Sequence, residues 1–300
     1  MATQTKQRPL RLLSILCGLT ALSMFSLFWA APVQANPLSD LVGRVRDYFD
    51  PPRPDSRPPG NRIAGGAARG CLIQRPVLPI VALVPKGSRE ALTLSDQPIF
   101  WFYSPYSQAI VAEGRDLYIS LTLTDITDAN EIYRGSFSIP EEPSISHVSA
   151  PVSLAAGEEY RWYVEVVCQV EGNDSSAVLG SVDSTVRRIL PDEDLTECLA
   201  AGEANGGEAA KVSAVECYAR ADLWYDMVTG IAELSCSEDS LDWTPLLTQG
   251  DVEVDDALED LEDEDRLQTE TGETITAEEA LMAIAQAPLA SYCSRDEASL

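Results

Sequence analysis

Few side chains in this sequence have the type and spacing that catalysis needs. His147 is the only histidine, and Ser146 beside it would lie on the opposite face of a strand, so the two do not form a nucleophilic pair. No Gly-x-Ser-x-Gly turn occurs. The adjacent carboxylates Glu141-Glu142 and Glu158-Glu159 could act as acid and base on a sugar, but both pairs fall in expected corners, where neighbouring side chains diverge. We interpret them as solvated turns and predict no catalytic residue and no cofactor.

A metal site is not favoured either. Asp251, Glu253, Asp255 and Glu262 match acidic positions of a calcium-binding EF-hand loop, but Asp256 stands where that loop needs a glycine for its sharp turn. The sequence has no Cys-x-x-Cys pair of the kind that binds zinc. We expect the acidic run to attract divalent ions only loosely, and whether it binds calcium stays open.

The cysteines favour disulfide bridges. Six of the seven lie beyond residue 35 and are at least 19 residues apart, and an even number in an exported protein permits bridges. Cys71 opens the first expected strand and Cys168 closes the sixth, so we expect these two to pair. Three pairings of the other four are possible. We favour Cys198 with Cys217, and Cys236 with Cys293.

The net charge of −27 is concentrated in the second half of the chain. Residues 191–300 contain 29 acids and four bases, whereas residues 36–190 contain 19 acids and 14 bases. An acidic half of this kind repels nucleic acid and anionic lipid surfaces. We therefore expect no nucleic-acid partner.

The first 35 residues are typical of a signal peptide. Lys6, Arg8 and Arg11 precede an apolar run over 12–31, and Val33 and Ala35 are small side chains where a signal peptidase reads the chain. We expect cleavage after Ala35, a periplasmic or secreted protein, and no membrane insertion after cleavage. The apolar run is also long enough to anchor the chain in the inner membrane, which is the alternative.

Composition divides the rest of the chain into three parts. Residues 36–70 predict a short amphipathic helix over 39–50 and a Pro/Gly-rich linker. Residues 71–190 read as strands, and residues 191–300 as a helical region. We expect helices over 192–200, 208–235 with a bend at Gly230, and 276–287 capped by Thr276, with an acidic disordered run over 251–273.

Two aromatic segments predict the packing of the strands. The segment 98–106 is apolar on both faces, and after Gly157 every second residue from Tyr160 is apolar. This second segment resembles the tyrosine corner of immunoglobulin-like domains. We therefore predict an α+β fold, with an N-terminal all-β immunoglobulin/fibronectin III-like sandwich followed by a C-terminal helical region packed on it.

The alternation of side chains along residues 98–106 gives an expectation for each face of this strand. We place Ile99, Trp101 and Tyr103 in the sandwich core, so that Phe100 and Phe102 point outward. A helix carrying Leu223, Trp224 and Val228 is expected to cover this outward pair. Phe100, Phe102 and Trp224 are therefore the candidate surface for binding or for docking of the helical region. If the helix left the pair bare, Phe100 and Phe102 would be the first candidates for a binding surface.

Several ordered motifs resemble a known family. They are Arg69-Gly70-Cys71-Leu72, Ala82-Leu83-Val84-Pro85, the segment from Thr93 to Tyr106, Tyr160-Arg161-Trp162-Tyr163 with Cys168, and Leu223-Trp224-Tyr225-Asp226. Over positions 69–293 the chain is similar to the cyanobacterial family catalogued as domain of unknown function 928. The family pattern has Gly where this chain has Asp222. The resemblance implies an exported cyanobacterial protein and no assigned activity.

These observations predict a non-catalytic interaction module of the periplasm or cell envelope that binds protein or glycan. One alternative is a hydrolase of envelope polysaccharide, and another is a structural or chaperone-like accessory protein. The sequence leaves open the identity of the ligand or partner and the oligomeric state.

Overall fold

The computed structural model describes residues 41, 43–45, 61–63, 70–74, 76–85, 91–170, 176–236, 247, 275–289 and 292–293. The predicted signal peptide, most of the predicted linker and the acidic run over 251–273, with its calcium-loop residues, lie outside this part of the chain. No helix within the described part is both long enough and apolar enough to cross a membrane.

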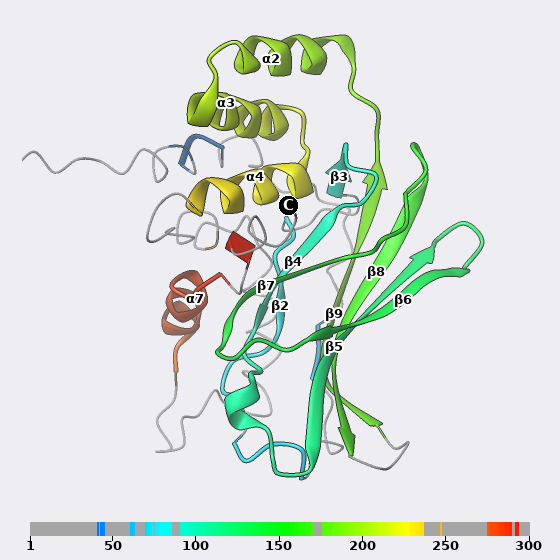
Figure 1. The fold of residues 1–300 in the computed structure, drawn as a ribbon, viewed down its shortest axis with the longest axis vertical. Helices are drawn as coiled ribbons and strands as arrows, with labels where there is room; N and C mark the ends of the chain where they lie inside the picture. Colours follow the sequence, from blue (N-terminus) through cyan, green and yellow to red (C-terminus); the bar gives the residue numbers. More distant parts are fainter. Residues whose placement is uncertain are drawn as a thin grey trace, which may run out of the picture. The chain divides into compact units, whose positions relative to one another are not determined.

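The fold is mixed α+β, with most strands preceding the helices (Figure 1). The strands are β1 (Asn61–Ile63), β2 (Val81–Ala82), β3 (Ala91–Thr93), β4 (Ile99–Ser104), β5 (Arg115–Asp125), β6 (Glu131–Ser138), β7 (Ser144–Ser149), β8 (Glu159–Val170) and β9 (Ser176–Arg188). The helices are the 3-10 turn η1 (Gln108–Ile110) and the α-helices α2 (Glu193–Glu203), α3 (Gly207–Arg220), α4 (Trp224–Ser235) and α7 (Ala277–Ala285).

The strands form two sheets. The larger has the order β1-β9-β8-β5-β6, and β3 also pairs with β9, in parallel. The smaller has the order β2-β4-β7. Period-two alternation puts Leu117, Ile119, Leu121 and Leu123 of β5 on the buried face of the larger sheet, as the sequence predicted. Trp162 of β8 is on the same face and stacks on Phe100 of the smaller sheet, with ring centroids 5.1 Å apart. The two sheets therefore pack face to face through aromatic side chains.

This contact corrects our assignment of the faces of β4. Phe100 and Phe102 face the larger sheet, whereas Trp101 faces away from it and packs against His147 and Tyr292, at centroid distances of 5.2 and 4.9 Å. The predicted alternation of side chains was right, but the two faces of the strand were assigned the wrong way round. Since both faces of β4 are apolar and both are buried, the sequence of the strand alone does not distinguish the two phases.

The corner before β8 is fixed by two local features. Gly157 has a φ of +88°, which a residue with a side chain rarely adopts. Tyr160 reaches back over the corner, and its hydroxyl accepts a hydrogen bond from the backbone N–H of Ala155 at 3.1 Å. Together these features set the direction in which β8 begins.

The helices α2, α3 and α4 follow one another as successive layers, and α4 contacts both β3 and β4 (Figure 1). Our predicted helix over 208–235 is in fact two helices. The break lies at Asp222, whose φ of +63° is rare for a residue with a side chain. Helix α4 continues through Gly230 without interruption. A Cβ atom there would lie 2.6 Å from Val215, so this glycine lets α3 approach α4 closely.

Two further segments attach to the sheets. Helix α7 begins with the expected Thr276 cap, a reciprocal capping box with Glu279. After α7, the backbone N–H of Ile145 in β7 donates to the carbonyl of Pro288 at 2.9 Å, so this segment covers part of the free edge of β7. The expected linker also contains a strand, β1, which pairs with β9. Leu41 and Val45 of the expected short helix are buried in the core.

Candidate functional site

The segment Leu223-Trp224-Tyr225-Asp226 docks α4 on the sheets. The Trp224 indole donates to the carbonyl of Leu83 at 2.8 Å. The Tyr225 hydroxyl accepts a hydrogen bond from the Trp162 indole at 2.7 Å and donates one to the carbonyl of Thr185 at 2.8 Å. Burial raises the pKa of Tyr225, which keeps its hydroxyl protonated and able to donate. These polar atoms are all used within the fold, so the segment is structural.

The carboxylate of Asp226 fixes the turn after β3. It accepts a hydrogen bond from the backbone N–H of Leu94 at 3.0 Å. Burial raises the pKa of Asp226, and hydrogen bonds from Leu94, Thr93 and Ser95 oppose that rise only in part. Because the folded state holds the proton more tightly than the unfolded chain, the contribution of this group to stability is full below about pH 3.8. It is lost as the pH rises through the raised pKa.

Replacement of Asp226 with Asn is therefore expected to flatten the pH dependence of stability. The amide oxygen can still accept from Leu94, but the variant has no buried charge to form. Urea unfolding from about pH 4 to about pH 7 should show wild type losing stability relative to Asp226→Asn as the pH rises. Asp194→Asn, on the exposed side of α2, is the matched control. Parallel curves for wild type and Asp226→Asn would contradict this account.

The candidate binding or docking surface of Phe100, Phe102 and Trp224 is buried in the fold. Both phenylalanines have 0% of their surface accessible, and Trp224 has 1%. These three residues are therefore placed for docking, and none of them is exposed to a partner. Helix α4 reaches both faces of β4, because Tyr225 contacts Phe100 edge-on and Thr229 accepts a hydrogen bond from the Trp101 indole.

Three disulfides are present, and they have the pairing that the sequence favoured. Cys71 is bonded to Cys168, Cys198 to Cys217, and Cys236 to Cys293. The first joins the segment before β2 to β8, and the second joins α2 to α3. Bridges of this kind persist in a non-reducing compartment and are rare in the cytosol.

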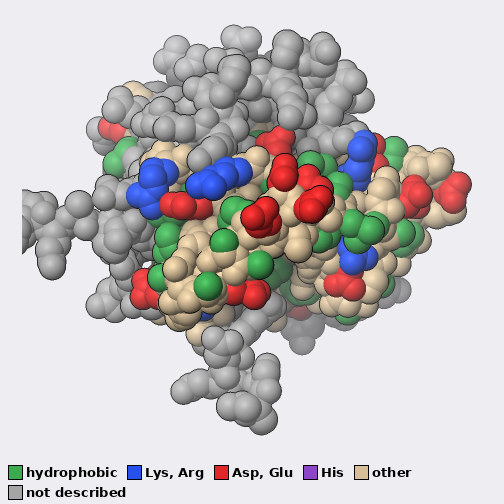
Figure 2. Space-filling view, turned by 90° about the horizontal axis from the view of Figure 1, so that it is seen from above, with side chains coloured by type: hydrophobic (Ala, Val, Ile, Leu, Met, Phe, Trp, Pro, Cys, Tyr) green, Lys and Arg blue, Asp and Glu red, His purple; other side chains and the backbone are tan. Residues whose placement is uncertain are grey.

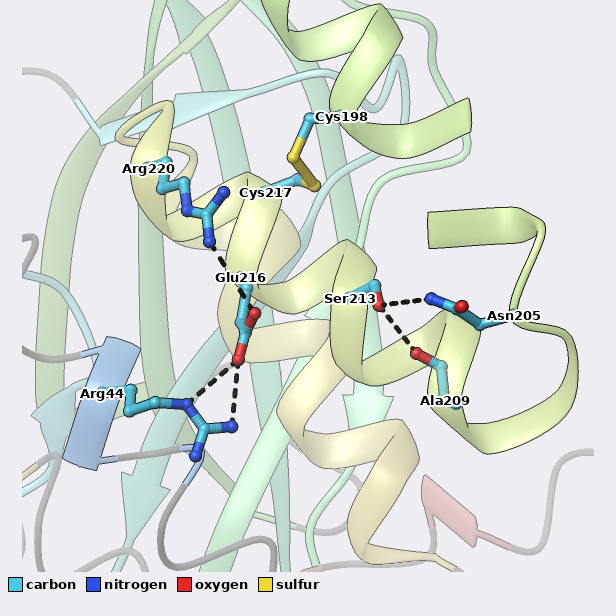
Figure 3. Close-up of polar contacts among 8 residues, drawn as sticks. All are labelled: Arg44, Cys198, Asn205, Ala209, Ser213, Glu216, Cys217 and Arg220. Carbon is cyan, nitrogen blue, oxygen red and sulfur yellow. Dashed lines mark hydrogen bonds and ion pairs between the residues drawn. A yellow bond between two sulfur atoms is a disulfide. The ribbon is translucent and has the colours of Figure 1, made fainter. Parts of the chain in front are cut away.

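A cleft of about 440 Å³ lies between α2 and α3, beside the Cys198–Cys217 bridge (Figure 3). Four of its polar side chains are paired within the protein. Glu216 binds Arg44 at 2.9 Å and Arg220 at 3.9 Å, and Ser213 accepts from Asn205 and donates to the carbonyl of Ala209. On the face seen from above, acidic and basic side chains are interspersed with hydrophobic ones (Figure 2).

A second cavity, of about 400 Å³, opens where β6 and β7 are the last strands of their sheets. We call it the edge cavity. Its walls are the aliphatic side chains of Ile119, Ile139, Pro140 and Pro288. Ile119 comes from the inner face of β5, and Pro288 from the segment that pairs with β7. The edge cavity thus lies between the two sheets.

Two serines of β7 lie deep in the edge cavity. Ser144 and Ser146 are 2% and 3% exposed, and their hydroxyls are 3.2 Å apart. Ser146 pairs with Phe102 in the register of β4 and β7, so it points to the inner side of the smaller sheet. The inner face of a sheet normally carries apolar side chains, so two buried hydroxyls there are an informative departure. Departures of this kind tend to occur at functional sites.

The mouth of the edge cavity is formed by exposed acids. Glu141 and Glu142 lie in the turn between β6 and β7, as predicted, and both line the opening. Sequence reasoning missed that this turn borders a cavity. His147 also borders it, but its ring packs between Trp101 and Tyr292, on the side of β7 opposite Ser146. The structure therefore does not assemble Ser146 and His147 into a nucleophilic pair.

The sequence signal for the edge cavity was weak. Ser144 and Ser146 are two residues apart on a strand whose next inward residue is Val148, a pattern that indicates a half-polar inner face. This interpretation requires knowing which face of β7 points inward. Only the pairing with β4 supplies that information. Among the described residues, no three His, Cys, Asp or Glu side chains are placed to hold a metal ion.

The fold and the edge cavity define a disulfide-bonded α+β protein with a buried hydroxyl pair between two sheets. The chain belongs to the family described as Domain of Unknown Function (DUF928), whose model matches residues 64–260. Comparison with the curated proteins found no match. The family match includes both serines of the edge cavity and the whole α4 docking segment, whereas Pro288 lies beyond it.

Proposed function

We propose that this protein is an exported, non-catalytic binding module of the cell envelope, and that the edge cavity is its binding site. The observation that carries the proposal is the pair of buried hydroxyls of Ser144 and Ser146 inside a cavity between the sheets. Its volume of about 400 Å³ falls in the range of small-molecule sites, about 300 to 1,000 Å³. The three disulfides support export, because the cytosol keeps thiols reduced.

The binding module is in our proposal an immunoglobulin/fibronectin III-like sandwich. In such sandwiches the strands called A, B and E share one sheet, and C, F and G share the other. The proposal is supported by β2, β4 and β7 sharing the smaller sheet while β5, β8 and β9 share the larger. The hydrogen bond between Tyr160 and Ala155 has the geometry of a tyrosine corner.

The wall and mouth of the edge cavity suit a preformed site. The backbone N–H of Gln108 donates to the carbonyl of Pro140 at 3.0 Å, and Ile145 holds Pro288. Two prolines, Pro140 and Pro143, restrict the backbone of the turn that carries Glu141 and Glu142. A turn held in this way loses little conformational entropy when a ligand binds.

The proposal is tested by capture on the mature chain. Protein purified from the periplasm of an expressing bacterium is expected to begin at Asn36 by mass spectrometry, and is then immobilised. Wild type should retain a component of an envelope extract that Ser146→Val does not retain, because the valine side chain occupies the space above the hydroxyl pair. Ser149→Ala, on the outward side of the same strand, should retain it like wild type.

Equal retention by wild type and Ser146→Val would show that the edge cavity is not the binding site. The hydrolase alternative has one specific observation in its favour, namely that Glu141 and Glu142 line the same cavity. It predicts release of reducing sugar ends from envelope polysaccharide by wild type, and loss of that release in Glu141→Gln or Glu142→Gln. Binding without release supports the non-catalytic module.

A further inference from the structure

The hydrogen-bonding capacity of the edge cavity defines what it can bind. The hydroxyls of Ser144 and Ser146 carry two protons, and the bond between them uses one. Among the described residues, neither hydroxyl makes another hydrogen bond. By contrast, Ser104, which neighbours Ser144 on β4, donates to the carbonyl of Tyr106 at 3.1 Å. One of the two hydroxyl protons therefore has no protein acceptor among the described residues, and both serines line the edge cavity.

A ligand of the edge cavity must also suit its mouth. In their ionised form, Glu141 and Glu142 accept hydrogen bonds and donate none. A ligand that contacts them must therefore supply hydrogen-bond donors. No Lys or Arg lines the cavity, and the two carboxylates repel an anion. The walls of Ile119, Ile139, Pro140 and Pro288 contact apolar surface. The ligand thus needs an acceptor at its deep end, donors near the mouth, C–H surface between them and no negative charge.

From this pattern we propose that the edge cavity binds a neutral sugar residue of a glycan. Each sugar hydroxyl both donates and accepts, and the ring presents C–H groups to aliphatic walls. A Lys or Arg side chain brings donors only and leaves the buried serine proton without an acceptor. An acyl chain brings neither donor nor acceptor. This inference rests on the proposed function of the edge cavity as a binding site and names its ligand class.

The inference is tested by calorimetric titration of the full mature chain with three neutral probes, namely maltotriose, cellotriose and tri-N-acetylchitotriose. Trilysine is the cationic probe and trigalacturonic acid the anionic one. At least one neutral probe should bind, and neither charged probe should. Ser144→Ala/Ser146→Ala should weaken binding of that probe about tenfold, which corresponds to loss of one hydrogen bond.

Two variants make the outcome specific to the edge cavity. Ser149→Ala should bind the probe like wild type. Ser146→Val should abolish binding while its far-ultraviolet circular dichroism spectrum stays that of wild type, even though loss of the hydrogen bond to Ser144 lowers its thermal unfolding midpoint. Loss of binding with retained folding then reflects the cavity and not misfolding.

The possible failures are distinguishable. If no neutral probe binds, or if one binds equally to wild type and Ser146→Val, the glycan inference is overturned. If in the same experiments Ser146→Val loses a protein captured from envelope extract, the proposed function stands with a protein ligand. If Ser146→Val changes neither capture nor probe binding, both proposals fail.

Discussion

Loss of the Cys71–Cys168 bridge is expected to lower the free energy of unfolding by about 4 to 5 kcal/mol. The two cysteines are 97 residues apart, and a crosslink that closes a loop of this length restricts the unfolded chain strongly. The change is Cys71→Ala/Cys168→Ala, which leaves no free thiol from the pair. Urea unfolding at equilibrium measures the loss, and the denaturant slope m should rise because the unfolded chain exposes more surface.

The matched control is Cys198→Ala/Cys217→Ala. This bridge spans only 19 residues, so its loss should cost less, about 3 kcal/mol. The order of the two losses tests the explanation, since both bridges join buried or half-buried cysteines. A larger loss from the short bridge would mean that local packing of α2 on α3 outweighs the restriction of the unfolded chain.

Replacement of Tyr225 with Phe is expected to cost about 2 to 4 kcal/mol, although it removes a single oxygen atom. The ring can still pack edge-on against Phe100, whose centroid is 5.6 Å away. The Trp162 indole N–H, however, loses its partner in the interior, and the partly buried Thr185 carbonyl loses the hydroxyl that donates to it. Each buried group left without a hydrogen bond costs about 1 to 3 kcal/mol.

Chemical denaturation of Tyr225→Phe checks this value, and Tyr163→Phe is the control. Tyr163 follows Trp162 on β8 but lies on its other face and is half-buried, so its hydroxyl should contribute little. Near-ultraviolet circular dichroism should also change for Tyr225→Phe, because the indole of Trp162 loses a fixed partner. Equal stabilities of the two variants would show that the Trp162–Tyr225–Thr185 chain is not important for stability.

Local sequence patterns predicted the features that depend on neighbouring residues. The strict alternation over 117–123 gave the buried face of β5, and Thr276 gave the start of α7. These succeed because strand alternation and helix capping are decided within a few residues. The disulfide pairs followed from the order of the predicted elements, which brought the right cysteines near each other.

The missed features depend on contacts between distant segments. Strand β4 is buried on both sides, so its own residues carried no information on whether Trp101 or Phe100 faces the larger sheet. Gly230 suggested a bend because glycine weakens a helix, but its role is the close approach of Val215, which lies on another helix. The edge cavity was missed for the same reason, since Ser144 and Ser146 are interior residues only after β7 pairs with β4.

The motifs by which the sequence resembles the family are distinct from the residues that we propose for binding. The motif Leu223-Trp224-Tyr225-Asp226 and the pair Tyr160 and Trp162 are used to dock α4 and to set the corner before β8. In this chain these motifs hold the helices and the sheets together. The proposed ligand contacts, Ser144 and Ser146, are small side chains that no sequence motif marks.

The Cys236–Cys293 bridge also affects how the protein would respond to proteolysis. It encloses all of α7 and a further stretch of chain between α4 and α7. A protease that cut the backbone once between these cysteines would leave both fragments covalently joined. The segment holding Pro288 against β7 would then stay tethered to the sandwich, and the edge cavity would keep that wall in a nicked molecule. Such a nick would be visible on a gel only after reduction.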